Sequence, residues 1–302
     1  MTGRFQTEEN TEIYYYIEGE GYPLLFIHGL GGSLNNWNES YLYFLKKGFQ
    51  VIGIDLPGYG KSSKHEDFEY TISHYAKIVK EFLHFLKLKC PPILVGNSMG
   101  GQISSYFAAK YKSRLKALIL VDSSGLNEMN LFQEVLIHFT FEKNNIAQIL
   151  KYMIDIFSFN IFNNPKHPNA QTFIEEQKEM SKEEHYHGYC YALNQSTKAM
   201  MNAGLKDLLS EIQVPVMIIW GKNDRLIPSF YSEKFLEAIP GSSLKLIQNC
   251  GHVPQLEKPE EFNLYLEQFL NSILSAEEKT FFSKQNKFKN LITKIFKKGK
   301  TC

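Results

Sequence analysis

The chain has 302 residues, of which 43% are hydrophobic and 22% are charged, and its formal net charge is +1. This composition is typical of a globular protein with one large domain and an insertion, and it excludes a disordered or fibrous chain. The first ten residues are polar, and no uncharged apolar run approaches the ~18 residues of a membrane span. The four cysteines lie far apart and form no CxxC pair. We therefore expect neither a cleaved signal nor a disulfide framework, and a cytoplasmic location.

Short apolar runs alternate with helical patterns along most of the chain. The sequence predicts strands at 13–17, 24–27, 51–55, 93–95, 117–121, 216–220 and 244–247, and helices at 36–47, 75–88, 100–111 and 230–238. Apolar strands separated by helices indicate an α/β protein with a mostly parallel sheet of about eight strands, flanked by helices on both faces.

Residues 125–213 break this alternation, because they show helical periodicity and little strand signal. The polar segment Asn163–Pro168 divides them into two helical groups. We predict a helical cap at 125–213, inserted into a core formed by 1–124 and 214–278. Most of its aromatic and methionine residues are expected to pack the cap itself, and others to line an apolar pocket.

The last segment, 279–302, is a basic tail with eight lysines and no acidic residue, whereas the preceding 278 residues have a net charge of −7. Its apolar residues fall at helical spacing with lysines between them, which predicts a basic amphipathic helix. Three alternatives stay open: a disordered solubilising extension, a helix docked on the acidic body, and a peripheral anchor on anionic lipid. We expect no nucleic-acid partner, and the sequence does not indicate an oligomeric state.

The most informative residue is Ser98, in the pentapeptide Gly-Asn-Ser-Met-Gly directly after the apolar run 93–95. A GxSxG motif between a strand and a helix is the layout of a nucleophile elbow. Gly96 and Gly100 allow the tight turn that holds the serine hydroxyl toward substrate.

Partners for Ser98 are expected where other strands end, because ligands bind at the carboxyl ends of parallel strands. Asp224 follows the run 216–220, and His252 follows the run 244–247. Asp122, at the end of 117–121, is an alternative acid, although it is also typical of a cap or turn.

Five motifs in register resemble the α/β-hydrolase superfamily, in its branch with a helical cap, over roughly residues 11–274. They are His28-Gly29-Leu30-Gly31-Gly32-Ser33, Asp55-Leu56-Pro57-Gly58-Tyr59-Gly60-Lys61-Ser62, the elbow, Trp220-Gly221-Lys222-Asn223-Asp224, and the segment from Gly251 to Pro259. The resemblance implies a triad in the chain order Ser, Asp, His.

In that triad Ser98 is the nucleophile, His252 is the general base, and Asp224 orients the imidazole. Some members of the superfamily carry the acid at the position of Asp122. The resemblance also places the backbone N–H groups of Leu30 and Met99 in the oxyanion hole. We expect no cofactor and no metal, since His185 and His187 lie two apart with no further ligands.

Residues that are absent from the motifs exclude some of the reactions known for this superfamily. A serine at the elbow argues against dehalogenases and epoxide hydrolases, which use a carboxylate nucleophile. Hydrolases of dienoate ring-cleavage products resemble this chain around the elbow, but they usually carry a cap arginine and a tryptophan after the catalytic histidine. Residues 125–213 contain no arginine, and Val253 follows His252.

We therefore predict a serine hydrolase for small to medium apolar esters, similar to an esterase or a monoacylglycerol lipase. Other triad chemistry stays open as an alternative, namely C–C bond hydrolysis, lactone hydrolysis or cofactor-free perhydrolysis. A receptor or scaffold with the hydrolase fold is a further alternative, which the complete triad disfavours.

Overall fold

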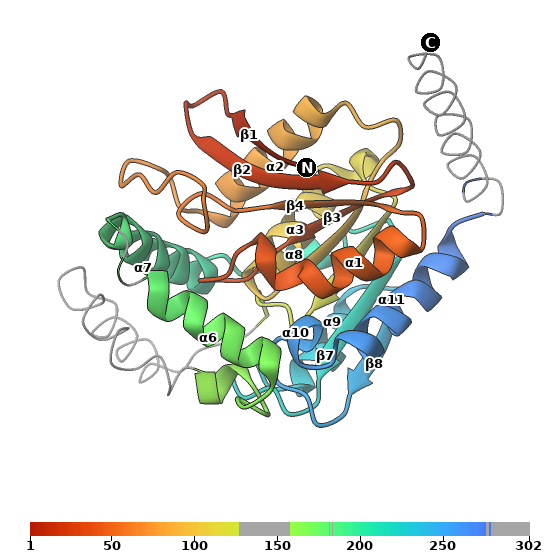
Figure 1. Cartoon of the computed structure of the whole chain (residues 1–302). Coiled ribbons are helices and arrows are strands. Elements are labelled where there is room, and N and C mark those ends of the chain that lie inside the picture. Colours follow the sequence, from red (N-terminus) through yellow and green to blue (C-terminus); the bar gives the residue numbers. More distant parts are fainter. Residues whose placement is uncertain (127–157, 181, 183, 276–277, 279–302) are drawn as a thin grey trace, which may run out of the picture.

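The structure is a computed structural model that describes residues 1–126, 158–180, 182, 184–275 and 278. In this part of the chain eight strands form one sheet in the order β1-β2-β4-β3-β5-β6-β7-β8 (Figure 1). β1 pairs antiparallel with β2, and β2 pairs antiparallel with β4, whereas the pairs β4–β3, β3–β5, β5–β6, β6–β7 and β7–β8 are parallel. The strands are β1 (Thr2–Gln6), β2 (Glu12–Glu18), β3 (Pro23–Ile27), β4 (Gln50–Ile54), β5 (Ile93–Asn97), β6 (Ala117–Val121), β7 (Val216–Gly221) and β8 (Ser243–Ile247). The predicted fold class is confirmed.

Helices cover both faces of the sheet (Figure 1). One face carries α1 (Asn38–Lys46) and α11 (Pro259–Ile273), and the other carries α2 (Ile72–Leu86), α3 (Met99–Lys110) and α9 (Phe230–Ala238). Between β6 and β7 the described helices are α6 (Pro168–Met180), α7 (Tyr186–Asn202) and α8 (Lys206–Leu209). The short elements are η1 (Leu34–Trp37), η2 (Lys112–Arg114) and α10 (Pro254–Glu257).

Two hydrophobic cores result from the alternation of side chains along the strands. In β3, Leu25 and Ile27 pack with the core on the α2 and α3 side, while Leu24 and Phe26 pack with the core on the α1 and α11 side. Each of the four side chains is fully buried. This burial on both faces explains why the strands are continuous apolar runs in the sequence.

The structure contains all seven predicted strands and, within two to three residues, the four predicted helices. It adds β1, which the sequence analysis missed because only alternate residues of this edge strand are partly buried. It also adds α11, whose apolar face packs on the sheet. The predicted helical pattern at 131–157 and the basic tail at 279–302 lie outside the described residues.

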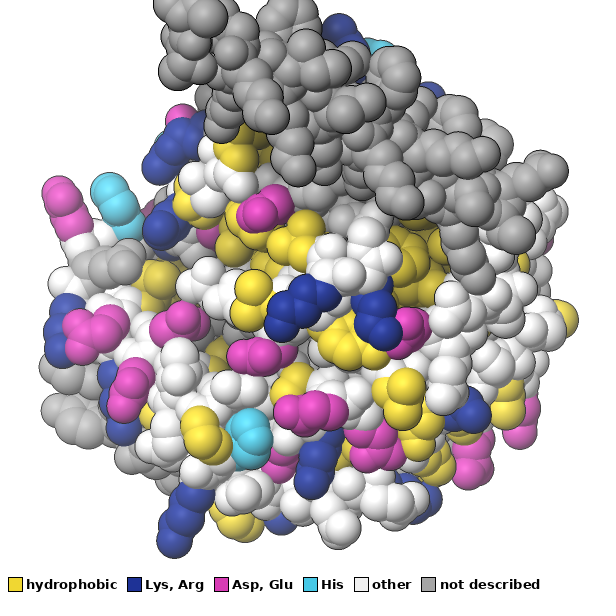
Figure 2. Space-filling model, turned by 45° about the vertical axis from the view of Figure 1, so that its right-hand side comes forward, with side chains coloured by type: hydrophobic (Ala, Val, Ile, Leu, Met, Phe, Trp, Pro, Cys, Tyr) yellow, Lys and Arg dark blue, Asp and Glu magenta, His cyan; other side chains and the backbone are white. Residues whose placement is uncertain are grey.

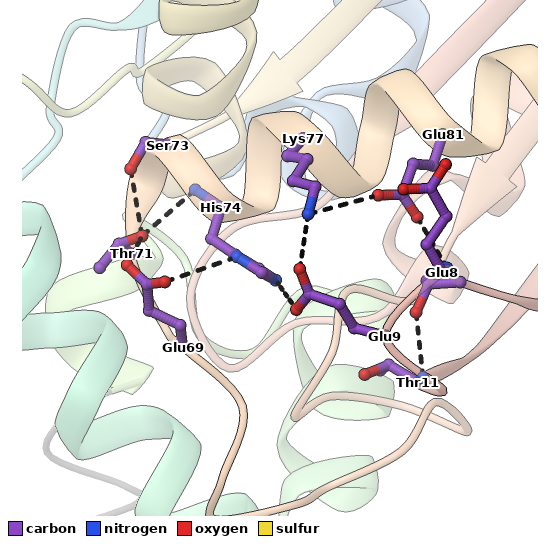
Figure 3. A network of polar contacts seen from close by, with 10 residues as sticks. Glu8, Glu9, Thr11, Glu69, Thr71, Ser73, His74, Lys77 and Glu81 are labelled. Carbon is purple, nitrogen blue, oxygen red and sulfur yellow. Dashed lines mark hydrogen bonds and ion pairs between the residues drawn. The ribbon is translucent and has the colours of Figure 1, made fainter.

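The loop between β1 and β2 is tied to α2 by a network of polar side chains (Figure 3). Glu9 forms ion pairs with Lys77 at 2.5 Å and with His74 at 3.2 Å, and the backbone N–H of Glu8 donates to Glu81 at 3.1 Å. Thr71 accepts from the His74 N–H and caps the helix. Because Glu9 and Lys77 are exposed, their ion pair contributes little to stability.

The described surface mixes charges of both signs. In the view of Figure 2, lysine and arginine side chains are interspersed with acidic ones, and hydrophobic side chains form small groups between them. Within the described ranges no helix combines the length and hydrophobicity that crossing a membrane requires.

Candidate active site

The sheet topology places the predicted site residues at the carboxyl ends of the parallel strands. The strand order reverses at β3, whose neighbours are β4 on one side and β5 on the other, and such a reversal opens a crevice at the carboxyl ends. The loop after β3 therefore lies beside the turn after β5, which carries Ser98. The loops after β6, β7 and β8 lie at the same end of the sheet. They carry Asp122, Asp224 and His252, respectively.

Ser98 adopts the strained backbone of a nucleophile elbow. Its φ is 54° and its ψ is −116°, a conformation that a residue with a side chain rarely adopts. The flanking glycines are required, because a Cβ on Gly96 would lie 2.3 Å from the Gly100 carbonyl oxygen, and a Cβ on Gly100 would lie 2.3 Å from the Ile27 carbonyl oxygen. The turn thus packs directly against the end of β3.

The hydroxyl of Ser98 forms no hydrogen bond with another described residue. Bonds between a nucleophile and its base are often long in structures without substrate and tighten when substrate binds. The Ser98 side chain is 7% exposed, and that of His252 is equally buried.

Asn97 is a residue that the sequence analysis missed. Its side-chain amide donates to the carbonyl oxygens of His252 and Val121, both at 3.1 Å. It thereby joins the elbow to the loop of His252, 155 residues away in the chain. The only sequence signal was a polar residue before the serine, which does not identify its partners.

Asp224 and His252 form the expected acid–base pair. Asp224 Oδ2 lies 2.7 Å from His252 Nδ1, and both side chains are buried. Asp224 Oδ1 accepts from the backbone N–H groups of Leu226 and Ile227 at 2.8 and 3.0 Å. The carboxylate is therefore fixed by its own loop, and it leaves Nε2 of the imidazole for a second partner.

Asp122 lies beside this pair but does not form a hydrogen bond to His252 in the described part of the chain. Its Oδ1 accepts from the Gly221 N–H at 2.9 Å. Burial raises the pKa of Asp122 well above its usual range, and the neighbouring Asp224 carboxylate adds to the rise. Of the two candidate acids, Asp224 is therefore the one that is hydrogen-bonded to the imidazole.

These three side chains are also a cluster of metal-ligand type, since one ligand atom from each lies within 4.8 Å of the others. Their atoms are largely committed to the hydrogen bonds just described. His187, in contrast, is 66% exposed and pairs with Glu66 at 3.2 Å.

The loop after β3 and the elbow each carry one of the two predicted oxyanion donors, Leu30 and Met99. In the described part of the chain, the N–H groups of Leu30 and Met99 have no hydrogen-bond acceptor. Gly29 packs against Ser98, because a Cβ on Gly29 would lie 3.0 Å from the Ser98 Cβ. A tetrahedral oxyanion formed at Ser98 could therefore meet two unpaired donors.

His28 braces this loop from inside the protein. Its Nε2 accepts from the Leu56 N–H at 3.0 Å, and its Nδ1 donates to the Gly29 carbonyl oxygen at 2.7 Å. This pattern requires one proton, on Nδ1. Complete burial supports it, because burial lowers the pKa of His28 to about 4.

Glu257 anchors the His252 loop to the start of the described cap. It is 2% exposed and accepts from the Gly251 N–H at 2.7 Å, from the Asn163 N–H at 3.1 Å, and from the Asn164 N–H. The His252 N–H in turn donates to the Ile161 carbonyl oxygen at 2.7 Å. The position of the His252 imidazole thus depends on residues 161–164.

Comparison with known proteins agrees with this geometry. Residues 22–259 match the model of the alpha/beta hydrolase fold family. The 2-hydroxy-6-oxononadienedioate/2-hydroxy-6-oxononatrienedioate hydrolase of Escherichia coli is 28% identical over 89% of this chain and 99% of its own length. The 2-hydroxy-6-oxo-6-(2'-aminophenyl)hexa-2,4-dienoic acid hydrolase of Metapseudomonas resinovorans is 26% identical over 86% of this chain and 87% of its own length.

Among solved structures, an esterase from Exiguobacterium antarcticum superposes with a TM-score of 0.78 and 26% identity, covering 90% of this chain and all of that one. The chain thus aligns over most of its length with relatives whose names describe two different reaction types. With a family model matched over residues 22–259, the chain belongs to the alpha/beta hydrolase family and is a hydrolase.

Proposed function

We propose that the protein hydrolyses carboxylic esters with small to medium apolar acyl groups, as an esterase or a monoacylglycerol lipase does. The observation that carries this proposal is the combination of a strained Ser98 elbow with the buried Asp224–His252 pair at 2.7 Å. A serine hydroxyl is a weak nucleophile at neutral pH, and such a pair is what activates it.

The reaction proceeds through two tetrahedral intermediates. His252 Nε2 takes the hydroxyl proton as Ser98 Oγ attacks the ester carbonyl carbon, and the carbonyl oxygen becomes an oxyanion held by the N–H groups of Leu30 and Met99. The C–O bond to the alcohol then breaks, and His252 returns the proton to the leaving alcohol. Water attacks the acyl-enzyme by the same route and releases the acid.

The arginines of this chain favour a neutral substrate over an anionic dienoate. The chain has three arginines, none within residues 125–213. Arg225 is the one beside Asp224, and its Nη1 already donates to the carbonyl oxygens of Phe159 and Phe162 at 2.7 and 3.1 Å. A substrate carboxylate would therefore lack the forked cation that binds it best.

A second candidate is the hydrolysis of a C–C bond in a 2-hydroxy-6-oxo-dienoate. The specific observation in its favour is that the curated relatives from Escherichia coli and Metapseudomonas resinovorans bear names of this type. Against it stand Val253 after the histidine and the arginine-free cap sequence.

The two candidates are separated by comparing kcat/KM for p-nitrophenyl esters of increasing acyl length with kcat/KM for a 2-hydroxy-6-oxo-dienoate. The proposal predicts higher values for the esters and loss of that turnover in Ser98→Ala. Dienoate cleavage that exceeds ester turnover would assign the second function. Ester turnover that survives in Ser98→Ala would contradict the triad.

A further inference from the structure

The described cap helices reach the loop that carries the oxyanion donor. Gln177 of α6 donates from Nε2 to the Gly31 carbonyl oxygen at 3.0 Å, and the Tyr189 hydroxyl of α7 lies 3.3 Å from the same oxygen. The Tyr189 hydroxyl also lies 2.7 Å from Gln177 Oε1. Gln177 thus donates to this carbonyl, while the single hydroxyl proton of Tyr189, shared with the nearer Gln177 Oε1, holds the Gln177 amide in place.

Gly31 belongs to a tight turn that includes Leu30. The Gly32 N–H donates to the Gly29 carbonyl oxygen at 3.1 Å, which closes a turn of four residues. Gly31 has a φ of 72°, the left-handed value that a type II turn requires at its third residue. The conformation of this turn sets the direction in which the Leu30 N–H points.

Two peptide planes connect the cap contact to the oxyanion donor. A trans peptide is planar, with its C=O and N–H pointing in opposite directions, and the described chain has no cis peptide. Fixing the Gly31 carbonyl therefore fixes the Gly32 N–H, which bonds to the Gly29 carbonyl. That carbonyl lies in the same plane as the Leu30 N–H, so its direction decides where Leu30 donates.

The turn has little other support on its outer side. A cavity of about 590 Å³ lies there, lined in part by Gly31, Gly32, Asp55, Glu176 and Gln177. Among the described residues, Gln177 and Tyr189 are the only hydrogen-bond partners of the Gly31 carbonyl. Tyr189 is itself held firmly, since it is 5% exposed and packs edge-on against Tyr59.

We propose that Gln177 and Tyr189 are positioning residues for the oxyanion hole, so that docking of the cap helices on the Gly31 carbonyl aligns the Leu30 N–H for catalysis. This inference rests on the proposed serine-hydrolase function. It assigns α6 and α7 a part in the chemical step, in addition to any contact with substrate. The sequence gives no hint of it, because the glutamine and the tyrosine lie 146 and 158 residues from Gly31.

The test compares Tyr189→Phe, Gln177→Met and the double variant with the wild type, using p-nitrophenyl butyrate. Loss of a whole oxyanion donor costs about 10²–10³ in kcat, so we expect misalignment to lower kcat roughly 3- to 10-fold for each single variant and about 10- to 30-fold for the double one. KM should change less than about twofold, because ground-state binding does not use the oxyanion donor. The rate of phosphonylation by a fluorophosphonate should fall in parallel, since it develops the same charge.

Matched controls exist at other places in the fold. Gln171, also on α6, donates from its amide to the Pro165 carbonyl oxygen at 2.6 Å. Tyr22, directly before the amino end of β3, donates to the Pro91 carbonyl oxygen at 3.1 Å. Gln171→Met and Tyr22→Phe should keep the wild-type kcat. Tyr189→Phe retains the buried ring, so it provides a folded variant even where Gln177→Met does not fold.

The outcomes separate this inference from the function on which it rests. An active wild type with unchanged kcat in Tyr189→Phe and Gln177→Met would overturn the inference alone, as would a rise in KM at constant kcat. An equal loss of kcat in the two control variants would also overturn it. A wild type that neither turns over esters nor reacts with the fluorophosphonate would overturn the proposed function together with the inference.

Discussion

His252 Nδ1 lies 2.7 Å from Asp224 Oδ2. A second carboxyl, that of Asp122, has an oxygen within 4.8 Å of a nitrogen of the same imidazole. The two acids differ in what holds them. Asp224 accepts hydrogen bonds from two backbone N–H groups and lies against the imidazole, whereas Asp122 accepts one from the Gly221 N–H and its pKa is raised by burial. Their different environments assign them different roles.

The first prediction concerns these two acids. Asp224→Asn should lower kcat roughly 10⁴-fold, because an amide favours the wrong imidazole tautomer and cannot stabilise the imidazolium. Asp122→Asn should lower kcat by less than about tenfold, since burial already disfavours the charged form of Asp122 and it is Asp224 that bonds the imidazole. Steady-state ester hydrolysis by the two variants measures both. The opposite order of effects would make Asp122 the catalytic acid.

The second prediction concerns the strain at Ser98. Ser98→Gly and Ser98→Ala should both be inactive, but the glycine variant should be more stable by about 1 kcal/mol, because glycine adopts a φ of 54° without strain. Urea unfolding of the two variants measures this difference. Equal stability would mean that the elbow stores no strain at this residue.

The third prediction is a pH dependence of stability that originates at His28. Burial lowers its pKa from 6.5 to about 4 in the folded protein, so between these values the unfolded chain binds a proton that the folded protein does not. The contribution of His28 to the free energy of unfolding is therefore present above pH 6.5 and is lost as the pH falls toward 4. By linkage it amounts to about 3 kcal/mol.

The measurement is the difference in unfolding free energy between the wild type and His28→Gln across pH 4 to 7. The variant should be more destabilised at pH 7 than at pH 4. Using the difference removes the effect of Asp55, whose pKa burial raises to about 6 and whose contribution has the opposite sign. A difference that does not change with pH would show that His28 is not held neutral.

The fourth prediction concerns Glu257, which holds the loop of His252. Glu257→Ala should destabilise the protein by about 2–3 kcal/mol, because it leaves the buried N–H of Gly251 and the partly buried N–H of Asn163 without an acceptor. It should also lower kcat, since the imidazole loses its support. Lys77→Met, in the exposed network of Figure 3, is the control and should change stability by less than about 0.5 kcal/mol. Wild-type kcat in Glu257→Ala would refute the supporting role.

The strands and the sheet class could be predicted because a strand buried on both faces must be a continuous apolar run, as β3 and β6 are. The edge strand β1 could not, because its side chains are only partly buried and its place depends on pairing with β2. Ser98, Asp224 and His252 could be proposed as site residues because they lie in the turn after β5 and the loops after β7 and β8.

Features of the site that depend on contacts between distant segments could not be predicted from the sequence. The choice between Asp122 and Asp224 depends on hydrogen bonds at the ends of two neighbouring strands, and both residues follow an apolar run in the same way. Asn97, Gln177 and Tyr189 have common side chains in unremarkable local patterns. The partners of Asn97 lie in β6 and in the loop after β8, and those of Gln177 and Tyr189 include the turn after β3, so they become visible only in the packed structure.

The central claim is that Ser98 is the nucleophile, and covalent labelling tests it most directly. The protein is treated with a fluorophosphonate, and the modified peptide is identified by mass spectrometry in the wild type and in Ser98→Ala. If Ser98 is the nucleophile, one adduct forms, on the peptide containing Ser98. Both this adduct and ester turnover are then lost in Ser98→Ala. An adduct on another residue, or unchanged labelling of Ser98→Ala, would contradict it.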